Sequence, residues 1–239
     1  MNLKEKKHSF SSVKLFEQCP YAYYLRYVED QKEEANVYAM FGSFVHSILE
    51  RYFKGDLYAF ELADVFENEY SQNVTQKFQF YNVYKAFYNK TLNYLTTFDG
   101  IDGEIVGVEE KLEGKFGDYD FIGYADLIMR DDKGLFIVDH KSHGAFKSET
   151  ERTEYFRQLY LYAECIKQKY GEYPYKLVFN MFRVPKMETT LFDLEQSKNS
   201  VEWFENSVDK ILANTEWDCK VDKGYCSNLC GFDCPYNGK

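Results

Sequence analysis

The stretch GYADLIMRDDKGLFIVDHKS, residues 123–142, places two carboxylates and an amine where they can act together. If its central Asp-Lys pair forms the tip of a tight hairpin, Asp126 and Asp139 oppose each other with Cβ atoms about 5 Å apart. Lys141 then lies on the same face as Asp139. Two carboxylates this close repel unless a proton or a cation lies between them, and oxygen ligands favour Mg²⁺ or Mn²⁺. The pattern predicts a divalent metal site with a lysine beside it; the alternative is a surface hairpin with ordinary charges.

A second set of chemically active residues lies in CSNLCGFDC, residues 226–234, where three cysteines recur at four-residue intervals. Tetrahedral zinc and 4Fe–4S sites take four such ligands. Cys219 could supply the fourth thiolate by closing a short loop, which costs little entropy. Cys19 could supply it instead, because Cys19 and Cys234 both precede proline. The chemistry alone allows zinc or iron–sulfur. Cys165 lies in an apolar run, which predicts a core residue.

His46 follows Gly42 by one helical turn in FGSFVHSILERYFK, residues 41–54. This segment carries an apolar stripe at helical spacing, and His46 lies beside the stripe, as a ligand pointing into a cleft would. A lone histidine is more often structural. Gln158 and Tyr162 are i, i+4 neighbours on one face of another predicted helix. By themselves these two residues indicate only a helix surface and core.

The elements that must position these residues follow from periodicity and turn signals. Residues 11–28 predict two short helices, with Ser11 or Ser12 capping the first and Pro20 beginning the second. We expect helices over 41–54, two or three helices within 57–97, and helices over 151–170 and 195–213; strands are expected over 104–116, 119–130, 134–142 and 175–184. The order predicts an α/β domain with a helical insertion.

Other titratable residues are expected to lie outside the site. Glu109 and Glu110 fall on a predicted strand and are interpreted as surface charges, although either could add an acidic group. His8 and His143 carry no motif and are expected at the surface. The best candidates for contacts with nucleic acid are scattered basic residues, namely Lys147, Arg152 and Arg157.

Composition limits the class of protein. The chain has 239 residues, of which 45% are hydrophobic, so a packed core is expected. The formal net charge of −10 argues against non-specific adhesion to nucleic acid over the whole surface. Aromatic residues make up 19%, which suits a tyrosine-rich core or the stacking of unpaired bases. No apolar run approaches the roughly 18 residues of a membrane span, and no secretory signal is recognised. We expect a cytoplasmic protein with reduced or metal-bound cysteines.

The order of these motifs resembles the PD-(D/E)XK nuclease superfamily, and within it the RecB-like and AddB-like iron–sulfur exonucleases, which include CRISPR-associated and phage proteins. The resemblance covers nearly the whole chain and rests on six motifs: F-S-x-V-K-L-F-E-Q-C-P at 10–20, Gly42 to His46, Gly123 to Asp126, Asp139 to Lys141, Gln158 to Tyr162, and the terminal cysteines. It implies a restriction-endonuclease-like α/β fold, in which helices flank a central mixed sheet, with a helical N-terminal insertion and a cysteine-rich tail.

The resemblance also implies roles for individual residues. His46, Asp126, Asp139 and the backbone carbonyl of His140 would bind the metal, and Lys141 would orient water or stabilise charge on the phosphate. Gln158 and Tyr162 would line the site near DNA. A 4Fe–4S cluster would be held by Cys19, Cys226, Cys230 and Cys234. The chain departs from the commonest pattern in one respect, because Asp139 stands where many members carry glutamate.

The expected function is that of an Mg²⁺- or Mn²⁺-dependent DNA exonuclease acting on single strands or ends, in recombination and repair, phage DNA processing or CRISPR adaptation, with a protein partner in such a complex. The alternative is a non-catalytic iron–sulfur or zinc subunit that binds nucleic acid. A single domain over 1–239 is expected, with a helical part at 11–98, a catalytic core at 104–213 and a tail at 217–239 paired with Cys19.

Overall fold

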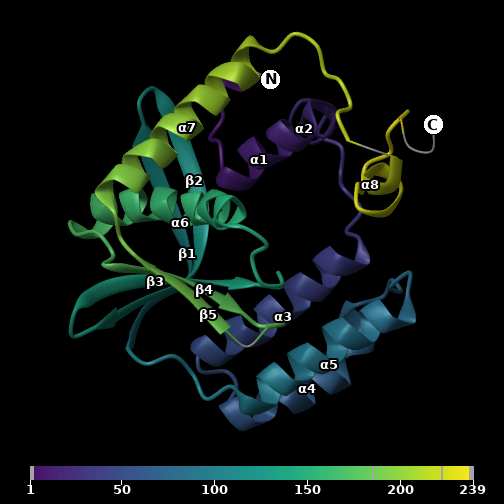
Figure 1. The fold of residues 1–239 in the computed structure, drawn as a ribbon, viewed down its shortest axis with the longest axis vertical. Helices are drawn as coiled ribbons and strands as arrows, with labels where there is room; N and C mark the ends of the chain where they lie inside the picture. The colour runs from purple at the N-terminus through teal and green to yellow at the C-terminus, as the bar shows by residue number, and fades with distance from the viewer. Residues whose placement is uncertain (1–2, 185, 222, 237–239) are drawn as a thin grey trace. The chain divides into compact units, whose positions relative to one another are not determined.

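The computed structural model describes residues 3–184, 186–221 and 223–236. The predicted helices and strands occur in the predicted order (Figure 1). The α-helices are α1 (Phe10–Gln18), α2 (Pro20–Tyr27), α3 (Val37–Phe53), α4 (Leu62–Asn73), α5 (Tyr81–Thr97), α6 (Glu149–Tyr170), α7 (Leu194–Ala213) and α8 (Lys223–Asn228); two 3₁₀ turns are η1 (Leu3–Glu5) and η2 (Ala59–Glu61). The strands are β1 (Glu104–Phe116), β2 (Tyr119–Asp131), β3 (Gly134–Lys141), β4 (Lys176–Met181) and β5 (Lys186–Leu191).

The five strands form one sheet in the order β1-β2-β3-β4-β5. The β3–β4 pair is parallel, whereas β2–β3 and β4–β5 are antiparallel. This mixed sheet with flanking helices confirms the predicted fold class. The hairpin register is also as predicted: the pairs run from Leu127 opposite Val138 to Asp131 opposite Gly134. Strand β5 is an addition to the predicted elements.

The residue contacts divide the chain into two compact units: the first comprises Met1–Asn36, Glu113–Gly123 and Lys198–Lys239, and the second Val37–Leu112 and Tyr124–Ser197. Strands β1 and β2 contribute residues to both units. The assignment of a single nuclease domain to 1–239 stays a prediction. Among the described residues, no helix is both long and apolar enough to cross a membrane.

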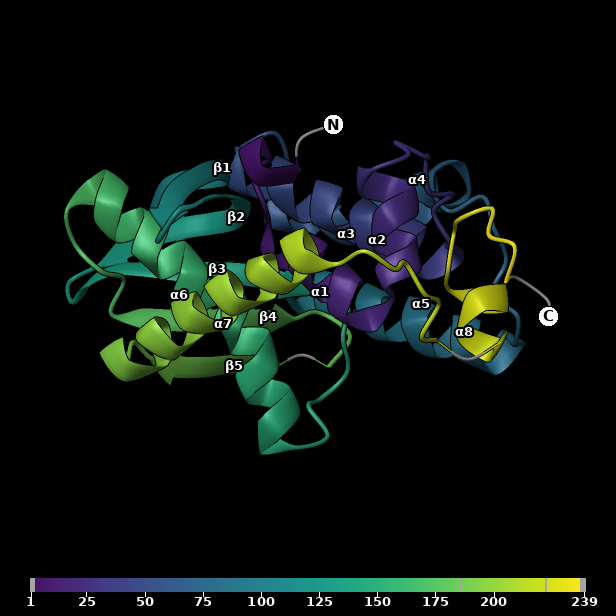
Figure 2. The same cartoon turned by 90° about the horizontal axis from the view of Figure 1, so that it is seen from above.

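The second unit is built around the apolar stripe of α3. The stripe is buried and includes Phe41, Phe44, Val45, Ile48 and Leu49. Its rings contact α4, which in turn packs against α5 (Figures 1 and 2). Strand β3 is buried from Leu135 to His140, as expected for a strand covered on both faces. These contacts fix α3 and β3, which carry His46, Asp139 and His140 among the predicted metal ligands, and β3 pairs with β2, which carries Asp126.

Helix α6 is anchored at both ends by local chemistry. The Ser148 side chain caps its N-terminus by accepting a hydrogen bond from the Glu151 N–H at 3.1 Å. Gly171 ends the helix in the left-handed conformation, with φ of 81°. Between these caps the buried face includes Phe156, Leu159 and Tyr162, and Cys165 is fully buried, as predicted.

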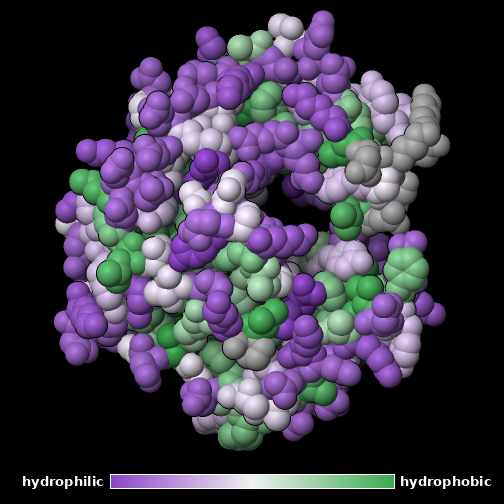
Figure 3. All heavy atoms as spheres, in the orientation of Figure 1, coloured by the Kyte–Doolittle hydropathy of each residue, from purple (hydrophilic) through white to green (hydrophobic). Residues whose placement is uncertain are grey.

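The first unit packs α1, α2 and α7 with the ends of β1 and β2. Phe204 of α7 contacts the rings of Phe116 and Phe121 with centroid distances of 5.5 and 5.3 Å. Most of the exposed residues of α7 are polar, among them Glu202 and Lys210, and the face of this helix in Figure 3 is mostly hydrophilic. Figure 2 shows α1 and α2 as consecutive short helices.

Two expectations for the N-terminal segment were wrong. The cap of α1 is Ser9, whose side chain accepts from the Ser12 N–H, and the Ser12 hydroxyl completes the capping box. His8 is buried rather than at the surface, because its backbone bridges to Phe121. Its pKa is lowered because burial disfavours the charged ring.

Candidate metal centre

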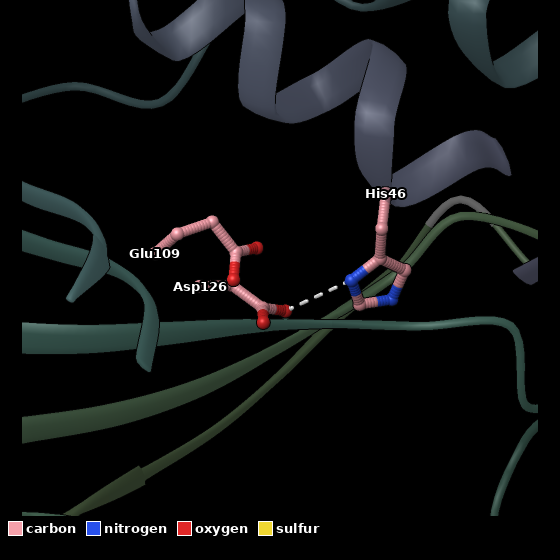
Figure 4. Close-up of side chains that lie close together, drawn as sticks. All are labelled: His46, Glu109 and Asp126. Atoms are coloured by element: carbon pink, nitrogen blue, oxygen red, sulfur yellow. Dashed lines mark ion pairs between the residues drawn. The ribbon is translucent and has the colours of Figure 1, made fainter. Parts of the chain in front are cut away.

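Three potential metal ligands come together from three different elements of the second unit. His46 projects from α3, Glu109 from β1 and Asp126 from β2, as Figure 4 shows. One ligand atom of each lies within 4.8 Å of the others. His46 Nδ1 is 3.4 Å from Asp126 Oδ2. One imidazole nitrogen and two carboxylates form a donor set that suits Mg²⁺ or Mn²⁺.

Glu109 was expected to be a surface charge, and this expectation was wrong. Its backbone has φ of 50°, in the left-handed region that few residues other than glycine adopt. Such a residue in a strand interrupts the regular alternation and redirects a side chain. Burial raises the pKa of Glu109, with the charge of Glu50 adding to the effect. The neighbouring Glu110 instead pairs with Lys169 on the same unit.

Asp126 and Asp139 adjoin the pair of Leu127 and Val138 in the β2–β3 ladder. Asp126 Oδ2 accepts a hydrogen bond from the backbone N–H of His140 at 2.6 Å. Burial, followed by repulsion from Asp139, raises the pKa of Asp126 well above its usual range. In the folded chain the charged form of Asp126 is therefore destabilised, and a bound cation would offset this destabilisation.

Lys141, Gln158 and Tyr162 form a connected polar network with Asp139. Lys141 Nζ is 2.7 Å from Asp139 Oδ2 and 3.1 Å from Gln158 Oε1. The Gln158 amide nitrogen donates to Asp139 Oδ1 at 3.1 Å and contacts the Tyr162 hydroxyl at 2.9 Å. Burial alone would lower the pKa of Lys141, but the nearby carboxylates Asp139 and Asp126 reverse the shift and raise it. The lysine is thus held as a cation beside the acidic residues.

The side chain of His140 does not join the ligand set. Its ring stacks on Phe53 with a centroid distance of 5.6 Å, and its Nδ1 lies 2.9 Å from the Asn180 amide nitrogen. Burial, together with the charges of His46 and Lys141, lowers the pKa of His140 well below its usual value. The backbone of His140 is nevertheless at the site, since it hydrogen-bonds both His46 and Asp126.

The space around Gly42 does not require a glycine, although the motif suggests that it would. A Cβ built at this position would meet the Ser142 Oγ at 3.5 Å, an ordinary contact. His46 itself is only partly exposed, and burial lowers its pKa while Asp139 opposes the shift. Its neutral imidazole is the form that binds metals.

Five cysteines gather in the first unit. Cys19, Cys226 and Cys234 are buried, and Cys219 and Cys230 are partly exposed. Cys219 Sγ is 3.8 Å from Cys226 Sγ. Burial, with the neighbouring thiol of Cys219, raises the pKa of Cys226 to about 11. Burial also raises the pKa of Cys230, and the thiols of Cys234 and Cys19 add to this shift. Thiols alone are the donor set of zinc and iron–sulfur sites.

Backbone contacts hold this thiol cluster to the N-terminal segment. The Glu34 N–H donates to the Gly231 carbonyl at 2.8 Å, and the Asn36 side chain donates to the Leu229 carbonyl at 2.9 Å. A Cβ at Gly231 would lie 2.0 Å from the Glu34 carbonyl oxygen, so only glycine fits there. From the sequence alone, both Cys219 and Cys19 could complete the set of terminal thiols, and the resemblance favoured Cys19; in the structure both lie in this cluster.

The three basic candidates differ in their surroundings. Arg152 is engaged with Glu149 and Glu188, and its guanidinium also donates to the Thr189 carbonyl. Lys147 is exposed, and Arg157 is partly exposed. His143, expected at the surface, is instead half-buried against Tyr155, with a centroid distance of 4.9 Å.

Comparisons with known proteins give one family match and two structural alignments. A family model described as the PD-(D/E)XK nuclease superfamily matches residues 7–238. A crystal structure of a "putative exonuclease" from Eubacterium rectale aligns with a TM-score of 0.53 and 15% identity, over 91% of this chain and 85% of that chain. A crystal structure of SSO0001 aligns with a TM-score of 0.39 and 17% identity, over 98% and 88% of the two chains. No curated protein matches the sequence.

Proposed function

Since the chain belongs to the PD-(D/E)XK nuclease superfamily, which supports a nuclease function, we propose that it is a metal-dependent DNA exonuclease that acts on single strands or DNA ends. The observation that carries the proposal is the convergence of His46, Glu109 and Asp126 within 4.8 Å, next to the ion pair of Asp139 and Lys141. Carboxylates and an imidazole can hold a divalent metal, and a lysine can stabilise charge on the phosphate, which together support phosphodiester hydrolysis.

The proposed roles of the residues combine the observed contacts with the roles that the motif resemblance implies. His46, Asp126 and Asp139, with the backbone carbonyl of His140, would hold Mg²⁺ or Mn²⁺, and Glu109 adds a carboxylate to this set. When bound, the metal supplies a Lewis acid and an activated water. Lys141, kept cationic by Asp139, orients the attacking water or stabilises the charge that develops on the phosphate.

Gln158 and Tyr162 position the other groups. Gln158 contacts Lys141 through its oxygen and Asp139 through its nitrogen, so it fixes the distance between cation and carboxylate. Tyr162 holds the Gln158 amide in place. The raised pKa of Tyr162, caused by burial, keeps its hydroxyl protonated.

The thiol cluster has a separate, structural role in this proposal. Cys19, Cys226, Cys230 and Cys234 would bind a 4Fe–4S cluster, and this metal would join the N-terminal helices to the tail. Two observations support the proposal: thiols from both ends of the sequence pack in one apolar cluster, and the motifs resemble those of RecB-like and AddB-like iron–sulfur exonucleases. Cys219 is a fifth thiol at the same place.

Purified protein incubated with internally labelled single-stranded DNA tests the activity. We expect stepwise shortening of the strand with Mn²⁺ or Mg²⁺ and none with EDTA. Ca²⁺ should not support cleavage, because its looser coordination rarely aligns an in-line displacement. Hydrolysis that persists in EDTA would contradict the proposed metal dependence.

The second candidate is a non-catalytic subunit that binds nucleic acid. The thiol cluster alone would favour it, but a binding module has no use for the buried Asp126, Asp139 and Lys141. Recombination and repair, phage DNA processing and CRISPR adaptation are all compatible contexts, and identification of a protein partner would separate them. Metal-dependent binding of DNA without any cleavage would favour the second candidate.

A further inference from the structure

A cluster of aromatic rings lies beside Lys141, and the outer part of this cluster is only half-buried. Its inner members are Phe179, which is fully buried, and Phe156, which is 2% exposed. Their ring centroids are 4.8 Å apart. Its outer members, His143, Phe146 and Tyr155, are only half-buried.

The outer rings are in mutual contact. The His143 ring lies 4.9 Å from Tyr155 and 5.8 Å from Phe146, and the Phe146 and Tyr155 centroids are 5.3 Å apart. Tyr155 and Phe146 each also contact Phe179, at 6.3 and 6.1 Å. The segment between β3 and α6, together with Tyr155 of α6, thus presents a partly exposed aromatic surface whose inner side packs on the buried ring of Phe179.

This aromatic surface adjoins the groups that would handle the phosphate. Lys141 Nζ lies 5.5 Å from the centroid of Phe179, the ring on which Tyr155 and Phe146 converge. Tyr155 precedes Gln158 by three residues on α6, so both side chains lie on neighbouring positions of one helical face. His143 follows Lys141 by two residues. A group attached to a phosphate at Lys141 would therefore meet these rings.

We propose that His143, Phe146 and Tyr155 form a stacking subsite for one unpaired nucleobase, that of the nucleotide next to the scissile phosphate. The inference rests on the proposed nuclease function and deepens it. Every base has an aromatic face, so stacking on a protein ring needs no particular sequence. A base must leave its partner to stack on protein, so the subsite selects single strands and frayed ends.

An oligonucleotide with one abasic tetrahydrofuran residue tests this subsite. The parent protein should pause at that residue, with the local cleavage step slowed about tenfold, the effect of losing one stacking interaction. Tyr155→Leu should slow cleavage at ordinary nucleotides by a similar factor and show no additional pause. Tyr155→Phe keeps a ring and should behave as the parent. Phe60→Ala removes an exposed ring that lies outside the cluster and should change neither rate.

A binding measurement keeps the test independent of cleavage. A single-stranded oligonucleotide carrying terminal 2-aminopurine, mixed with parent protein in Ca²⁺, should lose fluorescence on stacking, whereas Tyr155→Leu should not quench it. If the protein cleaves no DNA but still quenches, the nuclease proposal fails and the subsite stands. The subsite is wrong if the parent neither pauses nor quenches, or if Tyr155→Leu pauses as strongly as the parent. Lower thermal stability of Tyr155→Leu with unchanged pausing would show that the rings only anchor the segment.

Discussion

Lys141 Nζ lies 2.7 Å from Asp139 Oδ2, and the two side chains are 22% and 3% exposed. A cation and a carboxylate this close, and this far from water, depend on each other for their charged forms. The pair connects β3 to α6, because Gln158 hydrogen-bonds both members. The ion pair therefore holds a lysine ammonium group at a fixed place beside the proposed metal ligands.

Removing the cation tests its role. Lys141→Ala should reduce cleavage by at least about 100-fold, because it removes charge stabilisation at the phosphate. It should also lower thermal stability, since Asp139 loses its partner. Lys133→Ala is the matched control, because Lys133 is exposed at the tip of the same hairpin. Rates on labelled single-stranded DNA and melting curves check both effects. Activity of Lys141→Ala within about tenfold of the parent would contradict the assignment.

The two adjacent glutamates of β1, Glu109 and Glu110, allow a comparison of metal affinity between a proposed ligand and its neighbour. Glu109→Gln should weaken Mn²⁺ binding at least about tenfold, because it removes one charged ligand from the group with His46 and Asp126. Glu110→Gln should leave the affinity unchanged, since Glu110 pairs with Lys169. Calorimetric titration of the metal-free proteins measures both. Equal affinities for the two variants would show that Glu109 is not a ligand.

Stability of the metal-free protein should depend on pH through Asp126. A carboxyl group whose folded pKa is raised stabilises the fold fully below its unfolded pKa of about 3.9, and this contribution is lost as the pH rises through the folded pKa. Asp126→Asn cannot lose a proton. In EDTA its melting temperature should therefore exceed that of the parent at pH 8 and approach it at pH 4.

Asp131 on the same hairpin is the control for this effect. A hydrogen bond from the Tyr175 hydroxyl, at 2.5 Å, lowers the pKa of Asp131, so its charged form is favoured in the folded state. Asp131→Asn should not raise the melting temperature at pH 8. If Asp126→Asn is no more stable than the parent at pH 8, then the charged form of Asp126 does not destabilise the metal-free fold.

The thiol cluster gives an independent prediction about metal content. Protein purified without oxygen should be brown and contain iron. Cys19→Ser and Cys226→Ser should both lose iron and thermal stability, because each removes a proposed ligand from one end of the sequence. Cys165→Ser, in the core of α6, should keep the iron. Iron analysis of Cys219→Ser decides the fifth thiol: full iron is expected, and loss of iron from this variant with retention in Cys19→Ser would mean that the tail binds its metal alone.

The hairpin could be predicted because its determinants are local. A tight turn at Asp132-Lys133 fixes the register, and one correct pairing fixes every other pair. The apolar stripe of α3 and the Gly171 cap of α6 could likewise be predicted from short stretches of sequence. The positions of Asp126, Asp139 and Lys141 followed from these elements.

The remaining features depend on contacts between distant residues or on backbone conformation. The backbone at Glu109 is left-handed although the residue is not a glycine, so the sequence could not predict this conformation. His8 is buried by a bridge to Phe121, more than a hundred residues away. Strand β5 reads KMETTL, which is largely polar and exposed, as edge strands often are. The packing of His143 against Tyr155 likewise required the fold.

The most direct test of the nuclease proposal is the rate of degradation of labelled single-stranded DNA in Mn²⁺ by the parent, Asp139→Ala and Asp131→Ala proteins. Asp139 is both a proposed metal ligand and the partner of Lys141, whereas Asp131 lies on the same hairpin outside the site. We predict degradation by the parent and by Asp131→Ala, and none by Asp139→Ala that keeps the parent's circular dichroism. Equal rates for the folded Asp139→Ala and Asp131→Ala proteins would contradict the assignment of the active site.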